Sequence, residues 1–363
     1  MRWGLERALG LAVVWGLLAS GCATASAVID ARSPSEFGID HLPGAVNWPV
    51  LNDAERHEVG LQYVQVSAFE ARKRGAALVA RNIADHLDRE MPRLPRTWKP
   101  LVYCWRGGMR SGSMVTWMRL VGWDAQQLQG GYKGFRRHVI EGIEQRAPAL
   151  PLRVIAGPTG SAKSWLLRLL AEEGAQVLDL EGLASHRSSV LGLIPGQPQP
   201  SQKKFDTLIW DALGRFDPTR PVFVEAESRK VGNVSIAESL MLAMRASPCV
   251  RVDTPIELRV ELLMQDYPFF VNDIDFFCTR LQTLKDLRGK EVVDAWCQAA
   301  RAGHVKDVVR QLLEDHYDPG YANSTHRNYA QFSQALVVTV DDISPAALRA
   351  VAQQLLLQAT QAK

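Results

Sequence analysis

The segment Cys104–Ser111 contains one cysteine, two glycines and two arginines within eight residues, a composition suited to chemistry on sulfur. Because the glycines have no Cβ, their backbone N–H groups can curl around the sulfur, and Arg106 and Arg110 add positive charge. Such a loop favours a thiolate and any anion carried on it, for example a persulfide, a selenopersulfide or a phosphate. We therefore predict Cys104, Arg106 and Arg110 as catalytic residues; the alternative is a buried cysteine beside solvent-facing arginines.

The spacing within this loop resembles that of two known enzyme classes. Five residues separate Cys104 from Arg110, as in the Cys-x5-Arg loop of cysteine phosphatases, whereas many simple rhodaneses have one residue fewer. Tyr103 stands where such phosphatases usually carry a histidine. The longer loop predicts a wider anion cradle and leaves open which atom the cysteine carries.

A second Gly-rich segment, Gly157–Ser164, follows a predicted strand and opens a predicted helix, the setting of a phosphate-binding P-loop. Backbone amides in such a loop surround phosphate groups, Lys163 reaches their outer oxygens, and the Ser164 hydroxyl can ligate Mg²⁺. We predict Gly157, Gly160, Lys163 and Ser164 as binding residues.

Ala162 departs from this motif, which usually has glycine before the lysine. If that position requires an unusual φ, alanine carries a steric cost there. In that case Gly160 would supply the flexibility instead.

A predicted strand at residues 222–225 ends in an acidic residue and resembles the acidic strand that accompanies P-loops. Glu225 or Glu227 can hold a metal-bound water, and Arg229 and Lys230 can meet phosphate of a small ligand or of RNA. We predict Glu225, Glu227 and Arg229 as further binding residues, with Mg²⁺ as a possible partner and no dedicated metal-ligand set. The alternative is a solvated charge cluster after a strand.

A third polar stretch comprises 179–187, 199–202 and 205–206, and its pattern predicts irregular structure. For His186 in this stretch, a structural role and a functional role carry equal weight.

Alternating strand and helix patterns must position these motifs. We expect short buried strands at 27–30, 100–103, 152–156, 177–180, 221–225 and 337–340, and helices at 66–89, 112–120 and 164–173. From about residue 255 the pattern is mostly helical. This spacing predicts an α/β fold with two successive parallel-sheet units.

Length and composition agree with two globular domains. The 363 residues are 47% apolar and 22% charged, a composition that excludes wholesale disorder and a fibrous repeat. The net charge of +3 is too small to imply nucleic-acid binding by itself, although it is compatible with a local basic face. The five cysteines form no CxxC pair, which argues against a disulfide framework and a zinc ribbon and favours a reducing compartment.

The N-terminus points to a different compartment. Residues 8–21 form an apolar run preceded by arginines, with the length of a signal-peptide core, and Cys22 follows a lipoprotein-like cleavage box. We therefore treat residues 1–27 as a signal-like segment or an extension from a wrongly assigned start codon.

The ordered set of motifs resembles the tRNA 2-selenouridine synthase family, a rhodanese domain fused to a P-loop domain. The resemblance starts near Val28 and also includes the segments 55–60, 130–133, 179–187, 199–202, 225–232 and 316–319. It implies a rhodanese-like parallel-sheet domain over 28–147, then a P-loop NTPase-like α/β domain with a helical C-terminal region over 148–363.

The resemblance also implies a reaction. Members convert wobble 2-thiouridine in tRNA to 2-selenouridine, through S-geranylation with geranyl diphosphate and then selenation with selenophosphate. Selenium would be carried on Cys104, while Lys163 and Ser164 would hold the diphosphate without a need for ATP hydrolysis. Alkylation fits physically, because it turns the C2 sulfur into a thioether-type leaving group.

Partners and location follow from the same resemblance. We expect tRNA of the Lys, Glu and Gln types, an enzyme that supplies selenophosphate, no membrane, and the cytoplasm; export or lipid anchoring at Cys22 is the alternative location. Plausible RNA-contacting residues, unranked, are Arg136, Arg137, Arg229, Lys230 and Arg327. The alternative functions are a sulfurtransferase or Cys-x5-Arg phosphatase acting on a small molecule, and a non-catalytic RNA-binding module.

Overall fold

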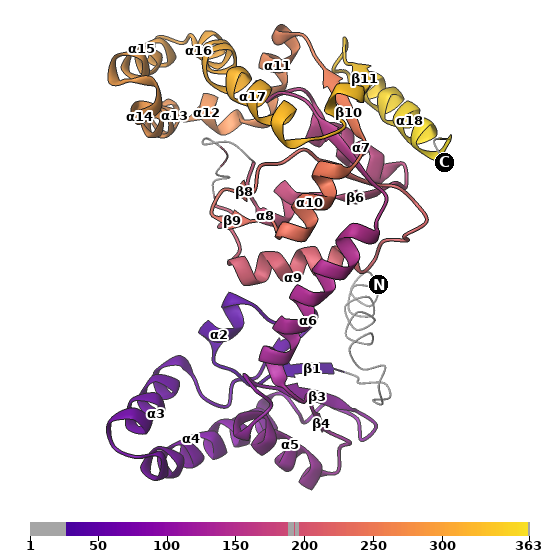
Figure 1. Cartoon of the computed structure of the whole chain (residues 1–363). Helices are drawn as coiled ribbons and strands as arrows, with labels where there is room; N and C mark the ends of the chain where they lie inside the picture. The colour runs from indigo at the N-terminus through magenta and orange to yellow at the C-terminus, as the bar shows by residue number, and fades with distance from the viewer. Residues whose placement is uncertain (1–26, 188–191, 193–195, 362–363) are drawn as a thin grey trace. The chain divides into compact units, whose positions relative to one another are not determined.

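The computed structural model describes residues 27–187, 192 and 196–361 (Figure 1). By their contacts, the residues group into two compact units. Unit 1 comprises the chain up to Gly142 together with Lys203–Gly214, and unit 2 comprises Ile143–Gln202 and Arg215–Lys363. The signal-like run and Cys22 lie outside the described residues. Within the described part of the chain, no helix has the length and apolar character needed to cross a membrane.

Unit 1 is built on a parallel sheet with the strand order β2-β1-β3-β4. Its strands are β1 (Ala27–Asp30), β2 (Val46–Asn47), β3 (Pro100–Tyr103) and β4 (Gln126–Gln127). β3 is fully buried, as expected for a continuous apolar strand between two neighbours. The carboxyl ends of these parallel strands share one edge, which is where ligands bind in open α/β sheets.

The helices of unit 1 are α2 (Pro34–Ile39), α3 (Asp53–Gln65), α4 (Ala68–Arg89), α5 (Met109–Val121), α6 (Gly131–Arg146) and α9 (Gln202–Leu213). Helix α4 begins at an N-cap, Ser67, whose hydroxyl accepts the N–H of Glu70. Its buried face packs toward a core that includes Ile83, Met114 and Trp123. The last residues of α6 carry the chain into unit 2.

Helix α9 returns to unit 1 from a part of the sequence that lies after the P-loop. Its apolar residues Phe205, Ile209, Trp210 and Leu213 recur at helical spacing and are buried. Trp210 meets the ring of Phe135 edge-on at 5.6 Å. The prediction of irregular structure over 205–206 is therefore wrong, because tertiary burial of this face outweighs the polar residues around it.

Unit 2 is built on a second parallel sheet with the order β11-β10-β5-β7-β6. Its strands are β5 (Leu152–Ala156), β6 (Gln176–Leu178), β7 (Val222–Glu225), β10 (Cys249–Asp253) and β11 (Leu336–Thr339). A short antiparallel hairpin joins β8 (Lys230–Val231) to β9 (Val234–Ser235). Strand β5 lies at the centre of the sheet, so the loop that follows it lies between the acidic ends of β7 and β10, Glu225 and Asp253.

Helices pack against this second sheet. Helix α7 (Lys163–Glu172) and helix α18 (Pro345–Gln361) pack together, as Figure 1 shows, and share a core with the apolar residues of β5, β7 and β10. Helix α10 (Glu238–Ala246) also packs on β5. Helix α8 (Leu180–Ala184) begins directly after β6 and shows that the predicted irregular stretch at 179–187 is helical in part.

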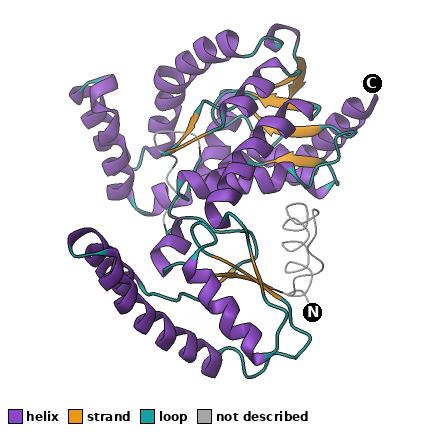
Figure 2. Cartoon of the chain, turned by 60° about the horizontal axis from the view of Figure 1, so that its bottom comes forward, coloured by secondary structure: helices purple, strands orange, loops and turns teal. Residues whose placement is uncertain are grey.

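The region after residue 255 is mostly helical, as predicted and as Figure 2 shows. It contains α11 (Ile256–Asp266), α12 (Pro268–Asn272), α13 (Ile274–Leu281), α14 (Lys285–Arg288), α15 (Lys290–Arg301), α16 (Val305–Gln311), a π-helical turn η3 (Leu312–Tyr317) and α17 (Asp318–Asn328). These helices enclose their own apolar core, which includes Phe277, Trp296 and Leu312.

The predicted α/β class with two parallel-sheet units is confirmed. Strand β10 is the main element that the sequence analysis did not predict. Its residues Cys249, Val250 and Val252 are buried and its register with β5 is parallel. Strand β6 ends at Leu178, two residues earlier than predicted, because Asp179 caps α8 by accepting the N–H of Gly182.

Candidate functional site

Cys104 lies in unit 1 between the end of β3 and the start of α5. The neighbouring residue Tyr103 is the last residue of a buried strand, so the thiol is held at the carboxyl edge of the sheet and is only 3% exposed. The Tyr103 hydroxyl, at the position of the phosphatase histidine, accepts the N–H of Leu42 at 3.2 Å. Tyr103 therefore fixes a loop of unit 1.

The thiol is surrounded by hydrogen-bond donors. The Ser111 hydroxyl donates to Cys104 Sγ at 3.1 Å, and the Gln127 amide donates to the Ser111 oxygen at 2.8 Å. Burial raises the pKa of Cys104, but donors from Ser111 and the Gly108 backbone, together with the charge of Arg110, outweigh it and lower the pKa below its ordinary value. The loop therefore favours the thiolate.

Cys249 and Cys278 differ from Cys104. Burial raises the pKa of Cys249 to about 11, and the pKa of Cys278 to about 11 as well. All the described cysteines are free thiols. Because the thiolate is the nucleophile, Cys104 is the most reactive of these three at neutral pH.

Backbone contacts hold the Cys104 loop in shape. Gly107 and Gly131 both have positive φ, and a Cβ at Gly131 would lie 2.3 Å from the carbonyl oxygen of Cys104. The N–H groups of Tyr132 and Lys133, at the start of α6, donate to the carbonyls of Cys104 and Trp105 at 2.8 and 2.9 Å. The glycine pair preceding Tyr132 is therefore needed for this close approach.

The two arginines of the loop have different surroundings. Arg110 forms a bidentate ion pair with Glu36, at 2.5 and 3.3 Å. Burial raises the pKa of Glu36, but the Arg110 charge and hydrogen bonds lower it overall. Arg106 is exposed, and its charge is not among the causes of the lowered pKa of Cys104. Of the predicted catalytic set, the structure thus brings Arg110 to the thiol electrostatically and leaves Arg106 at the surface.

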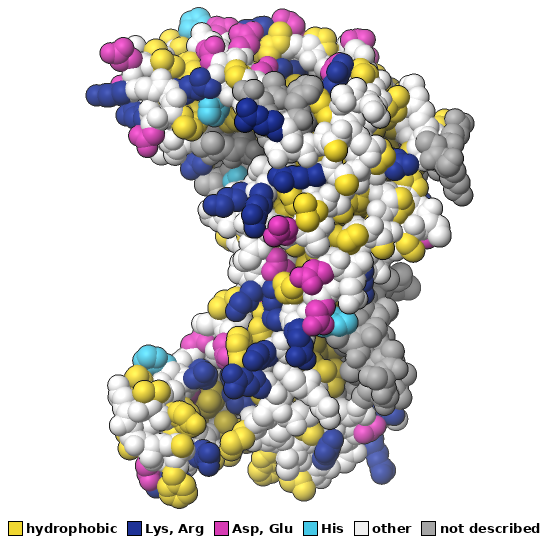
Figure 3. Space-filling model, in the orientation of Figure 1, with side chains coloured by type: hydrophobic (Ala, Val, Ile, Leu, Met, Phe, Trp, Pro, Cys, Tyr) yellow, Lys and Arg dark blue, Asp and Glu magenta, His cyan; other side chains and the backbone are white. Residues whose placement is uncertain are grey.

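Basic side chains gather near this loop on unit 1. Figure 3 shows Lys and Arg side chains over α2 and α6. Lys203 lies over the Trp105 ring at 5.6 Å, and Lys204 contacts His41 at 3.3 Å. Arg136 is engaged with Asp206 at 2.7 Å, whereas Arg137 is exposed.

In unit 2, the P-loop connects β5 to α7. Gly160 and Ala162 both adopt left-handed backbone, with φ of +79° and +68°. The left-handed conformation of Gly160 therefore does not spare Ala162 from adopting one as well. Alanine carries the steric cost at this position that was expected if an unusual φ was required. The Lys163 ammonium donates to the carbonyls of Gly157 and Pro158, at 2.6 and 3.0 Å, and lies against the loop.

Three carboxylates face this loop from the neighbouring strand ends. Oxygens of Glu181, Glu225 and Glu227 lie within 4.8 Å of one another, and Ser164 donates to Glu181 at 3.2 Å. Burial raises the pKa of Glu225 well above its ordinary range, and the neighbouring carboxylates raise it further, while Lys163 opposes them. Burial likewise lowers the pKa of Lys163. Carboxylate and hydroxyl oxygens are the ligands that Mg²⁺ prefers, so this cluster fits a divalent cation.

A cavity of about 610 Å³ surrounds the loop and these carboxylates. The predicted residues Gly157, Gly160, Lys163, Ser164, Glu225, Glu227 and Arg229 all line it. Further basic side chains on its wall are Arg168, His186, Arg187, Arg245 and His316. Guanidinium groups beside backbone N–H groups suit a phosphate, and the carboxylate cluster could hold a cation between such a phosphate and the protein.

A buried ion pair holds the P-loop in place through a hydrogen bond to one of its carbonyls. Arg259 is 5% exposed, pairs with Asp318 at 2.6 and 2.9 Å, and donates from Nε to the Thr159 carbonyl at 2.9 Å. Asp318 begins α17 within the motif 316–319 that carried the family resemblance. This contact joins that distant motif to the P-loop.

Some residues of these sites were missing from the sequence-based set. Glu181 was overlooked because it lies in a stretch that seemed irregular, although a carboxylate just after a strand end was its signal. His186, for which the sequence left both roles open, lines the cavity and is 5% exposed, and its buried Nδ1 has no hydrogen-bond partner among the described residues. Gln127 carried no sequence signal, because it reaches Ser111 only through pairing of β3 with β4.

Comparison with known proteins adds independent evidence. Residues 150–282 match a family model described as the tRNA 2-selenouridine synthase AAA domain, and residues 12–138 match the rhodanese-like domain. The second match begins ahead of Val28, in residues that the structure does not describe.

Similar curated proteins carry one name. A tRNA 2-selenouridine synthase of Alcanivorax borkumensis is 35% identical over 81% of this chain and 88% of that protein. One from Bdellovibrio bacteriovorus is 31% identical over 83% of this chain and 89% of that protein. One from Nitrosomonas europaea is 37% identical, and its alignment spans 66% of this chain and 63% of that protein. A rhodanese-like unit carrying Cys104, a P-loop unit and this extent of identity show that the chain belongs to the tRNA 2-selenouridine synthase family of enzymes.

Proposed function

We propose that this enzyme converts wobble 2-thiouridine of tRNA to 2-selenouridine, first by S-geranylation with geranyl diphosphate and then by selenation from selenophosphate. The observation that carries this proposal is the pairing, in one chain, of a thiol with a lowered pKa and a phosphate-binding cavity with a carboxylate cluster. The relatives named tRNA 2-selenouridine synthase support tRNA as the substrate.

The P-loop cavity suits the alkylation step. The C2 sulfur of the uridine attacks the carbon that bears the diphosphate, the C–O bond breaks, and the diphosphate leaves with its electron pair. Lys163 and the loop amides would bind the departing charge, with Arg229 at the cavity wall. A Mg²⁺ ion held by Ser164, Glu181, Glu225 and Glu227 would supply further neutralisation of the diphosphate.

The Cys104 loop suits the second step. The Cys104 thiolate, stabilised by donors from Ser111 and Gly108, would attack the phosphorus of selenophosphate, so that the P–Se bond breaks and selenide leaves with the electron pair. Selenide then attacks C2, the geranylated sulfur leaves as a thiolate, and water hydrolyses the phosphorylated cysteine to release phosphate. The tRNA of the Lys, Glu and Gln types, a selenophosphate-supplying enzyme and a cytoplasmic location belong to the same proposal.

Mass spectrometry of wobble nucleosides, from cells that depend on variants of this protein, tests the order of steps. Cys104→Ala should abolish 2-selenouridine and let the S-geranylated nucleoside accumulate. Lys163→Ala should block geranylation, the earlier step, so that the geranylated nucleoside does not form. Normal geranylation in Lys163→Ala would show that the P-loop does not bind the diphosphate, and selenation in Cys104→Ala would show that this thiol is not needed for selenium transfer.

A further inference from the structure

A narrow apolar cleft in unit 2 lies beside the P-loop cavity. Helices α11, α12, α13 and α16 and the turn η3 form its walls, and all of its lining residues except Thr159 are apolar or aromatic. Its walls include Leu263, Phe270, Phe277, Val309 and Leu313. Phe277 and Leu313 are essentially fully buried, while Leu263 and Val309 are only half-buried and can face an occupant.

The cleft and the P-loop cavity adjoin each other. Thr159 of the P-loop, Leu263 and Tyr267 of the α11 region and Tyr317 of η3 line both spaces. A molecule whose phosphates are bound by the P-loop therefore has the cleft next to it, across these four side chains. The ion pair between Arg259 and Asp318 fixes the P-loop to the same helical region.

We propose that this cleft binds the hydrocarbon chain of a prenyl diphosphate whose diphosphate group is held by the P-loop. The inference rests on the proposed function, in which geranyl diphosphate is the alkylating substrate. The inference adds where the hydrocarbon chain of the substrate lies and which residues select an apolar substrate.

The chemistry of the walls favours this occupant over a nucleoside. The base and ribose of a nucleotide carry polar groups, which the apolar walls would leave without hydrogen bonds, and this loss disfavours a nucleoside in the cleft. A prenyl chain has no such groups and gains by leaving water. The aromatic side chains Phe270, Phe277 and Tyr317 also contact the alkenes of such a chain favourably.

Ligand binding to the full-length protein tests the inference. Each buried CH₂ group strengthens binding by about fourfold, so geranyl diphosphate should bind at least roughly 100-fold more tightly than inorganic diphosphate. Dimethylallyl diphosphate, with half the chain, should bind with intermediate affinity. Titration calorimetry with these three probes measures the differences directly.

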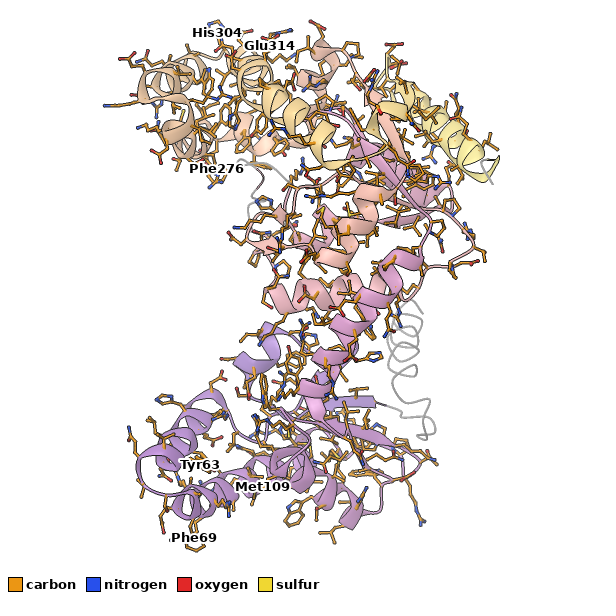
Figure 4. The ribbon with its side chains drawn as sticks, viewed as in Figure 1. Tyr63, Phe69, Met109, Phe276, His304 and Glu314 are labelled. Carbon is orange, nitrogen blue, oxygen red and sulfur yellow. The ribbon has the colours of Figure 1, made fainter. Side chains whose placement is uncertain are left out.

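Two variants at one wall position make the test specific. Val309→Asp places a charge in the cleft and Val309→Phe fills it, and both should weaken geranyl diphosphate binding at least tenfold while leaving inorganic diphosphate binding unchanged. Val292→Asp is the matched control, because Val292 is 43% exposed on α15 and lies outside the cleft. Phe276, which Figure 4 labels on α13, likewise does not line the cleft.

The outcomes separate the two proposals. Equal binding of geranyl and inorganic diphosphate, or unchanged geranyl diphosphate binding in Val309→Phe, overturns the cleft inference and leaves the P-loop assignment standing. Failure of the wild-type protein to bind either diphosphate, or binding that Lys163→Ala does not weaken, contradicts the proposed function itself. Selective loss of geranyl diphosphate binding in both Val309 variants supports the inference.

Discussion

At the scale of single residues, Cys104 is controlled by a short chain of hydrogen bonds. Gln127 donates both to the Ser111 oxygen and to the Gly108 carbonyl, and Ser111 donates to the sulfur. The Gln127 contacts fix the orientation of the Ser111 hydroxyl, so that its proton points to the thiolate. A thiolate stabilised in this way persists to lower pH than a free cysteine.

Removal of the Ser111 hydroxyl should raise the pKa of Cys104. The folded protein lowers this pKa, so the thiolate predominates from a pH below its ordinary value upward. A hydrogen bond to a charged group contributes about 1.5–3 kcal/mol, which corresponds to about one to two pKa units. In Ser111→Ala, the midpoint of the pH profile for Cys104 alkylation should move upward by that amount. Ser113→Ala, whose hydroxyl donates to the Met109 carbonyl, should leave the midpoint in place.

Ala162 stores backbone strain in the P-loop. Its φ of +68° costs a non-glycine residue about 1–2 kcal/mol, although its methyl group is buried in the core of unit 2. Ala162→Gly should therefore raise the free energy of unfolding by up to about 1 kcal/mol, after loss of the methyl contacts. Urea denaturation measures the change. A destabilised Ala162→Gly would mean that the methyl packing exceeds the strain.

At the scale of elements, the Arg259–Asp318 pair joins α11 and α17 to the P-loop. The guanidinium satisfies a loop carbonyl and a carboxylate at once, while being almost completely buried. The helical region after residue 255 is thus part of the support of the phosphate site. A mutation in α17 should consequently affect a loop more than a hundred residues earlier.

Asp318→Ala should lower the free energy of unfolding by about 3 kcal/mol, because it leaves a buried guanidinium without its partner. The same variant should weaken inorganic diphosphate binding, since the P-loop carbonyl loses a fixed donor. Glu257→Ala removes the exposed ion pair with Arg310 and should cost no more than about 1 kcal/mol. Equal effects of the two variants in chemical denaturation would contradict a supporting role for Asp318.

At the scale of the whole molecule, unit 1 is discontinuous in sequence. Residues 203–214 join it through α9, where Thr207 donates to buried Asp40 at 3.0 Å and Trp210 packs on Phe135. The Tyr132 hydroxyl donates to the same Asp40 oxygen at 2.8 Å. The rhodanese-like unit is therefore completed by residues that follow the P-loop in the chain.

Trp210→Ala should destabilise unit 1 strongly, because truncation of a buried tryptophan leaves a large cavity and costs about 3–5 kcal/mol. Trp210 is 1% exposed, whereas Trp117 of α5 is 45% exposed and Trp117→Ala should cost far less. Thermal unfolding followed by alkylation of Cys104 reports on unit 1 specifically. A near-native melting temperature in Trp210→Ala would show that α9 is dispensable for this unit.

The amino-acid sequence by itself determined the class of fold and the contiguous parts of both sites. It was possible to predict strands β1, β3 and β5 and the loops that follow them. The alternation of strand and helix patterns and the glycine content of the loops are local features of the sequence. Lys163, Ser164 and Cys104 were found for the same reason. The cost at Ala162 was also foreseeable, since it depends only on the φ of one residue.

Only the tertiary structure decided which distant residues meet these loops. Glu181 reaches Glu225 and Glu227 because β6 and β7 pair in parallel, and Gln127 reaches Ser111 because β4 pairs with β3. The return of α9 to unit 1, the Asp318 contact and the apolar cleft likewise depend on which faces pack together. Local spacing does not encode strand order or helix packing, since these follow from burying all apolar faces of the chain at once.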